Sequence, residues 1–175
     1  GSENITQFII DANSTQSNTQ PLIKLRTGSG IELLHIHSDD TSNTFIGLKA
    51  GRLNNALLNG LNNTFTGSYA GYSNTTGNSN TASGTNALRS NTSSSNNTAI
   101  GRDALYFNTF GGSNSAYGYG ALGLNTSGSS NTAIGSLALF SNQNGTLNTA
   151  TGSSALLRNS SGNYNTASGS DALNN

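Results

Sequence analysis

The chain has 175 residues, of which 32% are apolar and 8% are charged, with 22 glycines, one proline, no cysteine and a formal net charge of zero. The lack of cysteine excludes disulfide and thiolate chemistry, and no apolar run approaches the roughly 18 residues that a membrane-spanning helix requires. A composition this polar is typical of disordered chains unless a regular pattern imposes a fold. Nucleic-acid binding is not expected either, because it needs clustered lysine and arginine.

The N-terminal part of the chain carries no repeat. Gly1 and Ser2 are typical of a cloning remnant. Residues 3–42 contain the segments QFIIDA, PLIKLRT and IELLHIHS, which are rich in Ile and Leu and predict three strands. The segment Gly28-Ser29-Gly30 predicts a hairpin between the second and third strands. We expect a small β neck or cap here, too short to fold alone.

From Asn43 to the end, the sequence repeats with a period of 17 residues, except for one first copy of 20 residues. Numbering the leading Asn of each copy as place 1, place 5 is always Gly, place 8 is always Ala and place 12 is Asn in every copy that reaches it. A fixed period of this kind predicts a solenoid, in which each copy forms one coil that stacks on its neighbours. The eight copies begin at Asn43, Asn63, Asn80, Asn97, Asn114, Asn131, Asn148 and Asn165.

Within each coil we predict one strand at places 2–4, a bend at the place-5 glycine, a second strand at places 8–10 and a return turn at places 12–17. Alternation puts places 2 and 4 on one face of the first strand and place 3 on the other. The repeat-defining residues are the bend glycines, a leucine column at place 9 and an asparagine ladder at place 12. They include Gly84, Gly101, Gly118, Gly135, Gly152, Leu88, Leu105, Leu122, Leu139, Leu156, Asn91, Asn108, Asn125 and Asn142.

A single stack of such coils is thin, because each contributes about one Leu and several Ala to a core. Burial of one Leu stabilises by about 1.5–3 kcal/mol, whereas ordering each backbone residue costs about 1–2 kcal/mol. Two features could offset this cost: complete backbone pairing between coils, and association of several chains. Because place 3 is alanine from Ala82 to Ala167, and alanine columns allow close approach, we favour association.

The segments NTAIG at 97–101 and 131–135 resemble the repeats in the heads of YadA-like trimeric autotransporter adhesins. The longer pattern NTAIGxxALxxNTxG is also similar to repeats in bacteriophage tail-fibre-like proteins and in the mosaic adhesive trimer fibres of predatory bacteria. The resemblance covers residues 43–175 and implies an all-β parallel β-roll that assembles as a homotrimer. In two respects the chain differs from YadA-like heads: its period is longer, and place 2 is Thr or Ser instead of Val.

Aromatic residues concentrate in two adjacent coils and are the candidate ligand-binding residues: Tyr106, Phe107, Phe110 and Tyr119. Exposed aromatic rings can stack on sugars while neighbouring Asn side chains bond hydroxyl groups. The alternative is that aromatic residues such as Tyr117, at place 4, fill the core.

His35 and His37 lie two residues apart and would share one face of a strand. In a threefold fibre they could surround an axial metal ion, since imidazole binds Fe, Ni, Cu or Zn. The alternative is that both lie on the polar side of the neck strand. No other cofactor is expected. Both histidines lie in the neck, so a Ser-His-Asp triad has no support, and we predict no enzyme activity.

These patterns favour a non-enzymatic segment of a bacterial surface adhesin or tail fibre, extracellular or on a virion, that binds cell-envelope or glycan receptors. The alternatives are a passive spacer, with the adhesive tip elsewhere, and an ice-binding β-solenoid. Asn175 falls at place 11 of its repeat, which predicts that the natural chain continues.

Overall fold

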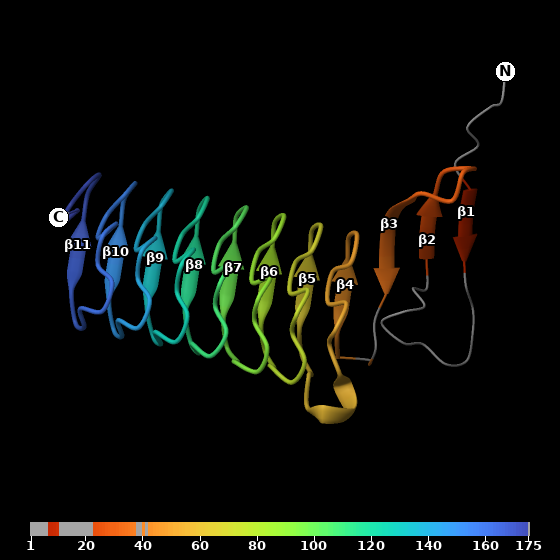
Figure 1. Cartoon of the computed structure of the whole chain (residues 1–175), viewed down its shortest axis with the longest axis horizontal. Coiled ribbons are helices and arrows are strands. Elements are labelled where there is room, and N and C mark those ends of the chain that lie inside the picture. Colours follow the sequence, from red (N-terminus) through yellow and green to blue (C-terminus); the bar gives the residue numbers. More distant parts are fainter. Residues whose placement is uncertain (1–6, 11–22, 38–39, 41, 175) are drawn as a thin grey trace, which may run out of the picture.

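The computed structural model describes residues 7–10, 23–37, 40 and 42–174. Its strands form one eleven-stranded sheet in which each strand pairs with the next along the chain (Figure 1). The first three strands, β1 (Gln7–Ile10), β2 (Ile23–Arg26) and β3 (Glu32–His37), are antiparallel, and a turn at 27–30 joins β2 to β3. The three strands and the hairpin predicted for this region are confirmed. β3 then pairs with the first solenoid strand, also antiparallel.

From residue 44 onward the strands are parallel and lie at places 2–4 of each coil, so the predicted parallel β-solenoid is confirmed. Each place pairs with the same place of the next coil, for example Ala99 with Ala116. The coils stack into a rod of about seven turns with a 17-residue spacing (Figure 1). The strands are β4 (Thr44–Ile46), β5 (Thr64–Thr66), β6 (Thr81–Ser83), β7 (Thr98–Ile100), β8 (Ser115–Tyr117), β9 (Thr132–Ile134), β10 (Thr149–Thr151) and β11 (Thr166–Ser168).

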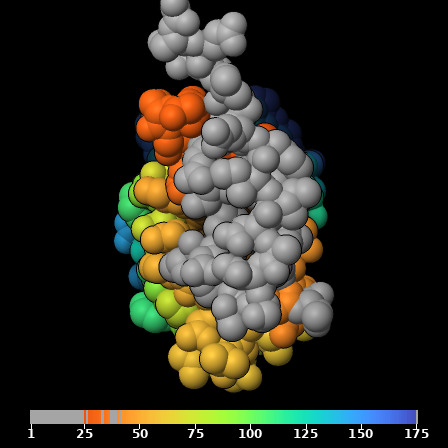
Figure 2. Space-filling model, turned by 90° about the vertical axis from the view of Figure 1, so that its right-hand side faces the viewer, coloured from red at the N-terminus to blue at the C-terminus, as the bar shows by residue number. Residues whose placement is uncertain are grey.

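The three extra residues of the first coil lie in a loop that contains the short 3₁₀ helix η1 (Ala56–Leu58). This loop protrudes from the rod, as the view along the rod from the N-terminal end shows (Figure 2). Leu57 is almost fully exposed at its tip. The insertion therefore leaves the stacking of the coils intact, because β4 and β5 still pair in register.

Each solenoid strand turns its middle residue into the core and its two outer residues outward. The predicted alternation between two faces is confirmed, but the alternation did not predict which face is buried. Ala99, Ala116 and Ala133 at place 3 are completely buried. By contrast, Ile100 and Ile134 at place 4 are exposed, and so is Tyr117, with 39% of its surface accessible. The alternative that Tyr117 fills the core is therefore wrong: it lies outside.

The second strand predicted at places 8–10 is wrong. The chain forms a turn there, because places 7 and 9 adopt the left-handed conformation, as in Asp103 (φ +58°) and Leu105 (φ +50°). The amide of Ala104 donates to the carbonyl of Gly101 within its own coil, whereas the amide of Leu105 donates to the carbonyl of Ala121 in the next. Left-handed backbone is costly for leucine, and sequence rules therefore do not place it there.

The core consists of two alanine columns, at places 3 and 8, and the place-9 leucine column, which is buried as predicted. In the first two coils Phe45 and Phe65 occupy place 3 and stack with ring centroids 5.2 Å apart. The alanine columns therefore lie inside each coil. This corrects the expectation that they form a small-residue face on which chains associate. The coils also pair through their turns, for example where the amide of Ser90 donates to the carbonyl of Tyr106 in the next coil. Backbone pairing between coils, one of the two features expected to offset the entropy cost of ordering the chain, is therefore present.

Glycine at place 5 bends the chain, as predicted. Gly118 has φ +136°, a value that favours glycine. Its backbone also lies so close to the next coil that a Cβ atom would stand 2.5 Å from the carbonyl oxygen of Gly135. Both the conformation and the close approach therefore require glycine at this place.

The predicted asparagine ladder at place 12 is confirmed. Each Nδ2 donates to the Oδ1 of the preceding coil's Asn, at 2.5–3.1 Å, from Asn74 to Asn159. A second ladder, not predicted, runs along place 1, where each backbone amide donates to the preceding Oδ1 at 2.8–3.0 Å.

In six of the eight coils the two ladders converge on one carbonyl oxygen. Asn131 and Asn142, for example, both donate to Gly145 O, at 2.8 and 3.0 Å. Ser94 replaces glycine at this point of its coil, and its hydroxyl joins the network by donating to Asn91 and accepting from Asn108. Burying these amides is tolerated because nearly every one is satisfied.

Candidate glycan-binding groove

The most distinctive surface feature is a groove in the turn at places 6–11, where the coil that starts at Asn114 has two glycines. Gly120 stands at place 7 between Asp103 and Leu137, and Gly123 stands at place 10 between Tyr106 and Phe140. Because the coils stack place on place, the two missing side chains leave a hollow between the side chains of the neighbouring coils.

The groove has a volume of about 400 Å³ and spans four coils. Aromatic and aliphatic side chains form most of its wall, and two polar side chains contribute at one end. Its lining residues are Asn86, Asp103, Tyr106, Phe107, Tyr119, Gly120, Gly123, Leu124 and Phe140.

Phe140 leans over the glycines that open the groove. A Cβ atom on Gly123 would stand 2.8 Å from Cε2 of Phe140, and one on Gly120 would stand 3.4 Å from its Cδ2. On the other side of the gap, the Tyr106 ring packs edge-on against Phe107, with centroids 4.5 Å apart. The groove thus has aromatic walls on both sides.

Phe107 also lines a second hollow, of about 470 Å³, which shares Leu124 with the first. The exposed Phe107 ring therefore separates two adjacent depressions. The remaining lining residues of the second hollow are Ser90, Thr109, Thr126 and Gln143. A ligand longer than one ring could contact both.

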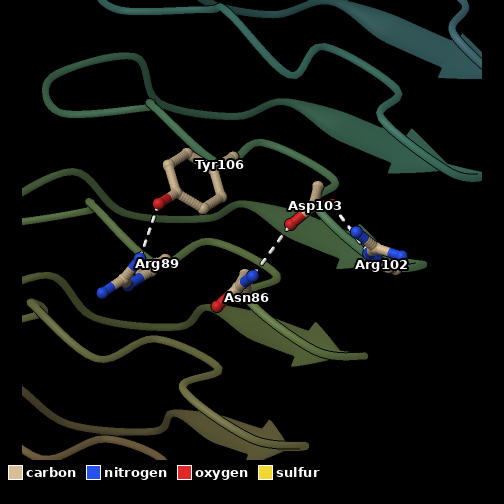
Figure 3. Close-up of polar contacts among 5 residues, drawn as sticks. All are labelled: Asn86, Arg89, Arg102, Asp103 and Tyr106. Carbon is tan, nitrogen blue, oxygen red and sulfur yellow. Dashed lines mark hydrogen bonds and ion pairs between the residues drawn. The ribbon is translucent and has the colours of Figure 1, made fainter.

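The polar end of the groove is held by contacts between two neighbouring coils (Figure 3). Asn86 Nδ2 donates to Asp103 Oδ1 at 3.0 Å, and Arg102 Nε donates to Asp103 Oδ2 at 3.0 Å. Arg89 Nη1 donates to the Tyr106 hydroxyl at 2.6 Å. The carboxylate and amide at this end are thus held in fixed positions, with lone pairs and N–H groups left to accept or donate further hydrogen bonds.

Three of the four predicted ligand-binding residues, Tyr106, Phe107 and Tyr119, line the groove together. The fourth, Phe110, is 70% exposed and lines neither hollow. The prediction missed Phe140, Gly120 and Gly123. The repeat itself carried a signal for them. When three successive coils are aligned, place 10 is occupied by Tyr106, Gly123 and Phe140, so a glycine lies between two aromatic residues.

The metal prediction concerns β3. His35 is buried, and its Nε2 lies 3.1 Å from Oε2 of Glu32 on the same strand. The side chain of His37 lies outside the described ones. Among the described residues, no cluster of three or more His, Cys, Asp or Glu side chains could hold a metal ion within one chain. A site shared between chains stays a prediction.

No family model, curated protein or solved structure matches the chain. Within the described ranges, no helix has both the length and the apolar character needed to cross a membrane.

Proposed function

We propose that this chain is a non-enzymatic segment of an extracellular fibre, a bacterial surface adhesin or a tail fibre, that binds cell-envelope glycans. The observation that carries the proposal is the groove between Tyr106 and Phe140. It combines aromatic rings, which pack on the apolar faces of sugar rings, with the fixed carboxylate of Asp103 and amide of Asn86, which bond hydroxyl groups. A mostly apolar hollow with a few oriented polar groups is the usual form of a small-ligand site.

In this proposal the fibre is a homotrimer, as the resemblance implies. The exposed column formed by Ile100, Tyr117 and Ile134 on the outer face of the sheet supports it. Three chains would present three grooves, and multivalent contact would turn weak single-site binding into firm attachment. The antiparallel strands β1–β3 would serve as the neck and would cover the first solenoid edge at β4.

A glycan array followed by titration of the best ligand tests the binding function. Tyr119→Ala should weaken that binding by roughly 2- to 10-fold, because one aromatic contact contributes about 0.5–1.5 kcal/mol. Tyr164→Ala is the matched control, since Tyr164 is also exposed but lies outside the groove. Equal binding by both variants would reject the groove as the site, and no binding to any glycan would favour the passive spacer.

One observation favours an ice-binding solenoid as the second candidate. Place 2 carries a hydroxyl in every strand, in register along the rod, from Thr44 to Thr166. The flat array that ice requires is interrupted, however, at place 4 by Ile100, Tyr117 and Ile134. Thermal hysteresis in a freezing-point measurement would support this candidate and its absence would exclude it.

A further inference from the structure

Basic residues gather on the first four coils, the last two of which also line the groove. Residues 43–113 contain four basic and one acidic side chain, which gives a net charge of +3, whereas residues 114–175 contain one of each. All four basic side chains stand at places 6, 7 or 10, in the same turn as the groove. We call Lys49, Arg52, Arg89 and Arg102 the basic strip.

Arg89 is held in place by tyrosines of the coils on both sides. Its guanidinium carbon lies 5.1 Å from the ring centroid of Tyr69, 6.0 Å from that of Tyr72 and 5.6 Å from that of Tyr106. The Lys49 ammonium likewise lies 5.1 Å from the Tyr69 centroid. An arginine fixed in this way loses little side-chain entropy when it binds an anion.

Within the solenoid, acidic side chains scarcely neutralise the strip. In residues 43–174 the only carboxylates are Asp103 and Asp171, and Asp103 pairs with Arg102. Across the described part of the chain, no ion pair is formed by Lys49, Arg52 or Arg89. Their combined field attracts anions toward the turn that leads into the groove.

We propose that the basic strip selects acidic polysaccharides, with carboxylates of uronic acid residues on Arg52 and Arg89 and an adjacent sugar ring in the groove. This proposal rests on the function proposed above and adds the charge of the ligand. The strip runs along the rod: with a coil rise of about 4.8 Å, Lys49 and Arg102 lie roughly 14 Å apart along the axis. A linear polymer lying lengthwise therefore contacts the strip over the first four coils and the groove that begins within them.

The same geometry disfavours a single-stranded nucleic acid. Binding of a single strand needs a densely positive groove that follows the phosphate backbone, whereas the strip has only four cations over four coils. A net charge of +3 spread over four coils suits a sparsely charged polymer better.

The test compares oligogalacturonate with its methyl ester, which has the same backbone without the charges. Binding is measured at low and high salt for the wild type and for Arg52→Gln/Arg89→Gln, Arg89→Lys and Arg158→Gln. Arg158 is the control because it is the one basic residue of the solenoid outside the strip. Thermal unfolding of each variant shows whether the tyrosine stack around residue 89 survives.

The wild type should bind the acid roughly tenfold more tightly than the ester, by the sum of two exposed ion pairs. The double variant should lose this preference, whatever affinity for the ester remains, because Arg89 also holds the Tyr106 hydroxyl at the groove. Arg89→Lys should retain most of the preference, and Arg158→Gln all of it. High salt should weaken binding of the acid alone.

Equal affinity for acid and ester in the wild type, or a preference that survives the double substitution, would overturn the inference but leave glycan binding intact. Failure to bind either polymer would count against both proposals, with the glycan array then deciding whether other sugars bind. Tighter, strip-dependent binding of a thymidine oligonucleotide would overturn the inference in favour of nucleic acid.

Discussion

Gly71 lies so close to the ring of Phe65 that a Cβ atom on the glycine would stand 2.5 Å from two of the ring carbons. Gly51 and Phe45 repeat this relationship in the first coil, at 2.7 Å. In the six later coils place 3 is Ala and place 9 is Leu. All of these alanines, and the leucines from Leu88 to Leu156, are buried. Places 3 and 9 therefore fill one shared volume of the core, and either place can supply the large side chain.

This shared volume predicts non-additive substitutions. Phe65→Ala alone should lower the free energy of unfolding by about 3–5 kcal/mol through the cavity it leaves. Gly71→Leu alone should lower it by about 1–3 kcal/mol through overpacking. The double variant should recover most of the loss, because it recreates the pair Ala82 and Leu88 of the next coil. Urea unfolding measures the cycle, and additive losses would contradict the shared volume.

Adjacent glycines in one return turn should differ sharply in their tolerance of alanine. A Cβ on Gly111 would meet the Gly128 carbonyl oxygen and would stand 2.6 Å from Asn108 Oδ1, whereas one on Gly112 meets its nearest atom, Ser95 O, at 3.2 Å. Gly111→Ala should therefore destabilise by about 1–3 kcal/mol or more, and Gly112→Ala by less than about 1 kcal/mol. Thermal unfolding of the two variants, measured side by side, checks this; equal midpoints would refute it.

The buried amide ladder should contribute more than exposed amides. Asn108 Nδ2 lies 2.8 Å from Gly111 O, and Asn125 Nδ2 donates to Asn108 Oδ1 at 2.7 Å. Asn108→Ala should lower the free energy of unfolding by about 1–3 kcal/mol for each buried polar group that it leaves without a partner. Asn144→Ala is the control, because the amide oxygen of Asn144 accepts its hydrogen bond from Ser127 at an exposed site. This substitution should change the free energy of unfolding by about 0.5 kcal/mol or less. Losses of similar size in urea unfolding would argue against the ladder.

The proposed trimer predicts a solution mass of three chains by light scattering. Tyr117→Glu should lower that mass, because it places a charge in the exposed apolar column of Ile100, Tyr117 and Ile134. Phe110→Glu is the control, since Phe110 is exposed but stands in the return turn. A stable monomer in the wild type would remove the trimer from the proposal and move the single-solenoid functions forward.

The sequence by its pattern established the repeat, the parallel stacking, the strand at places 2–4 and the alternation of its side chains between two faces, but not which face is buried. These features follow from period and alternation, which are local and visible along the chain. The ladder at place 12 and the bend at Gly118 were predictable for the same reason: a residue repeated at one place of a solenoid must stack on itself.

The tertiary structure alone decided the turn at places 8–10, the shared volume of Phe65 and Gly71, and the groove beside Gly123. Leu105 adopts a left-handed conformation that its own propensity opposes, because the amide and side chain at that place are fixed by the neighbouring coil and the core. The groove likewise exists only because Tyr106 and Phe140, 34 residues apart in the chain, stand on either side of one glycine. Contacts between coils, and not the sequence within one coil, set both features.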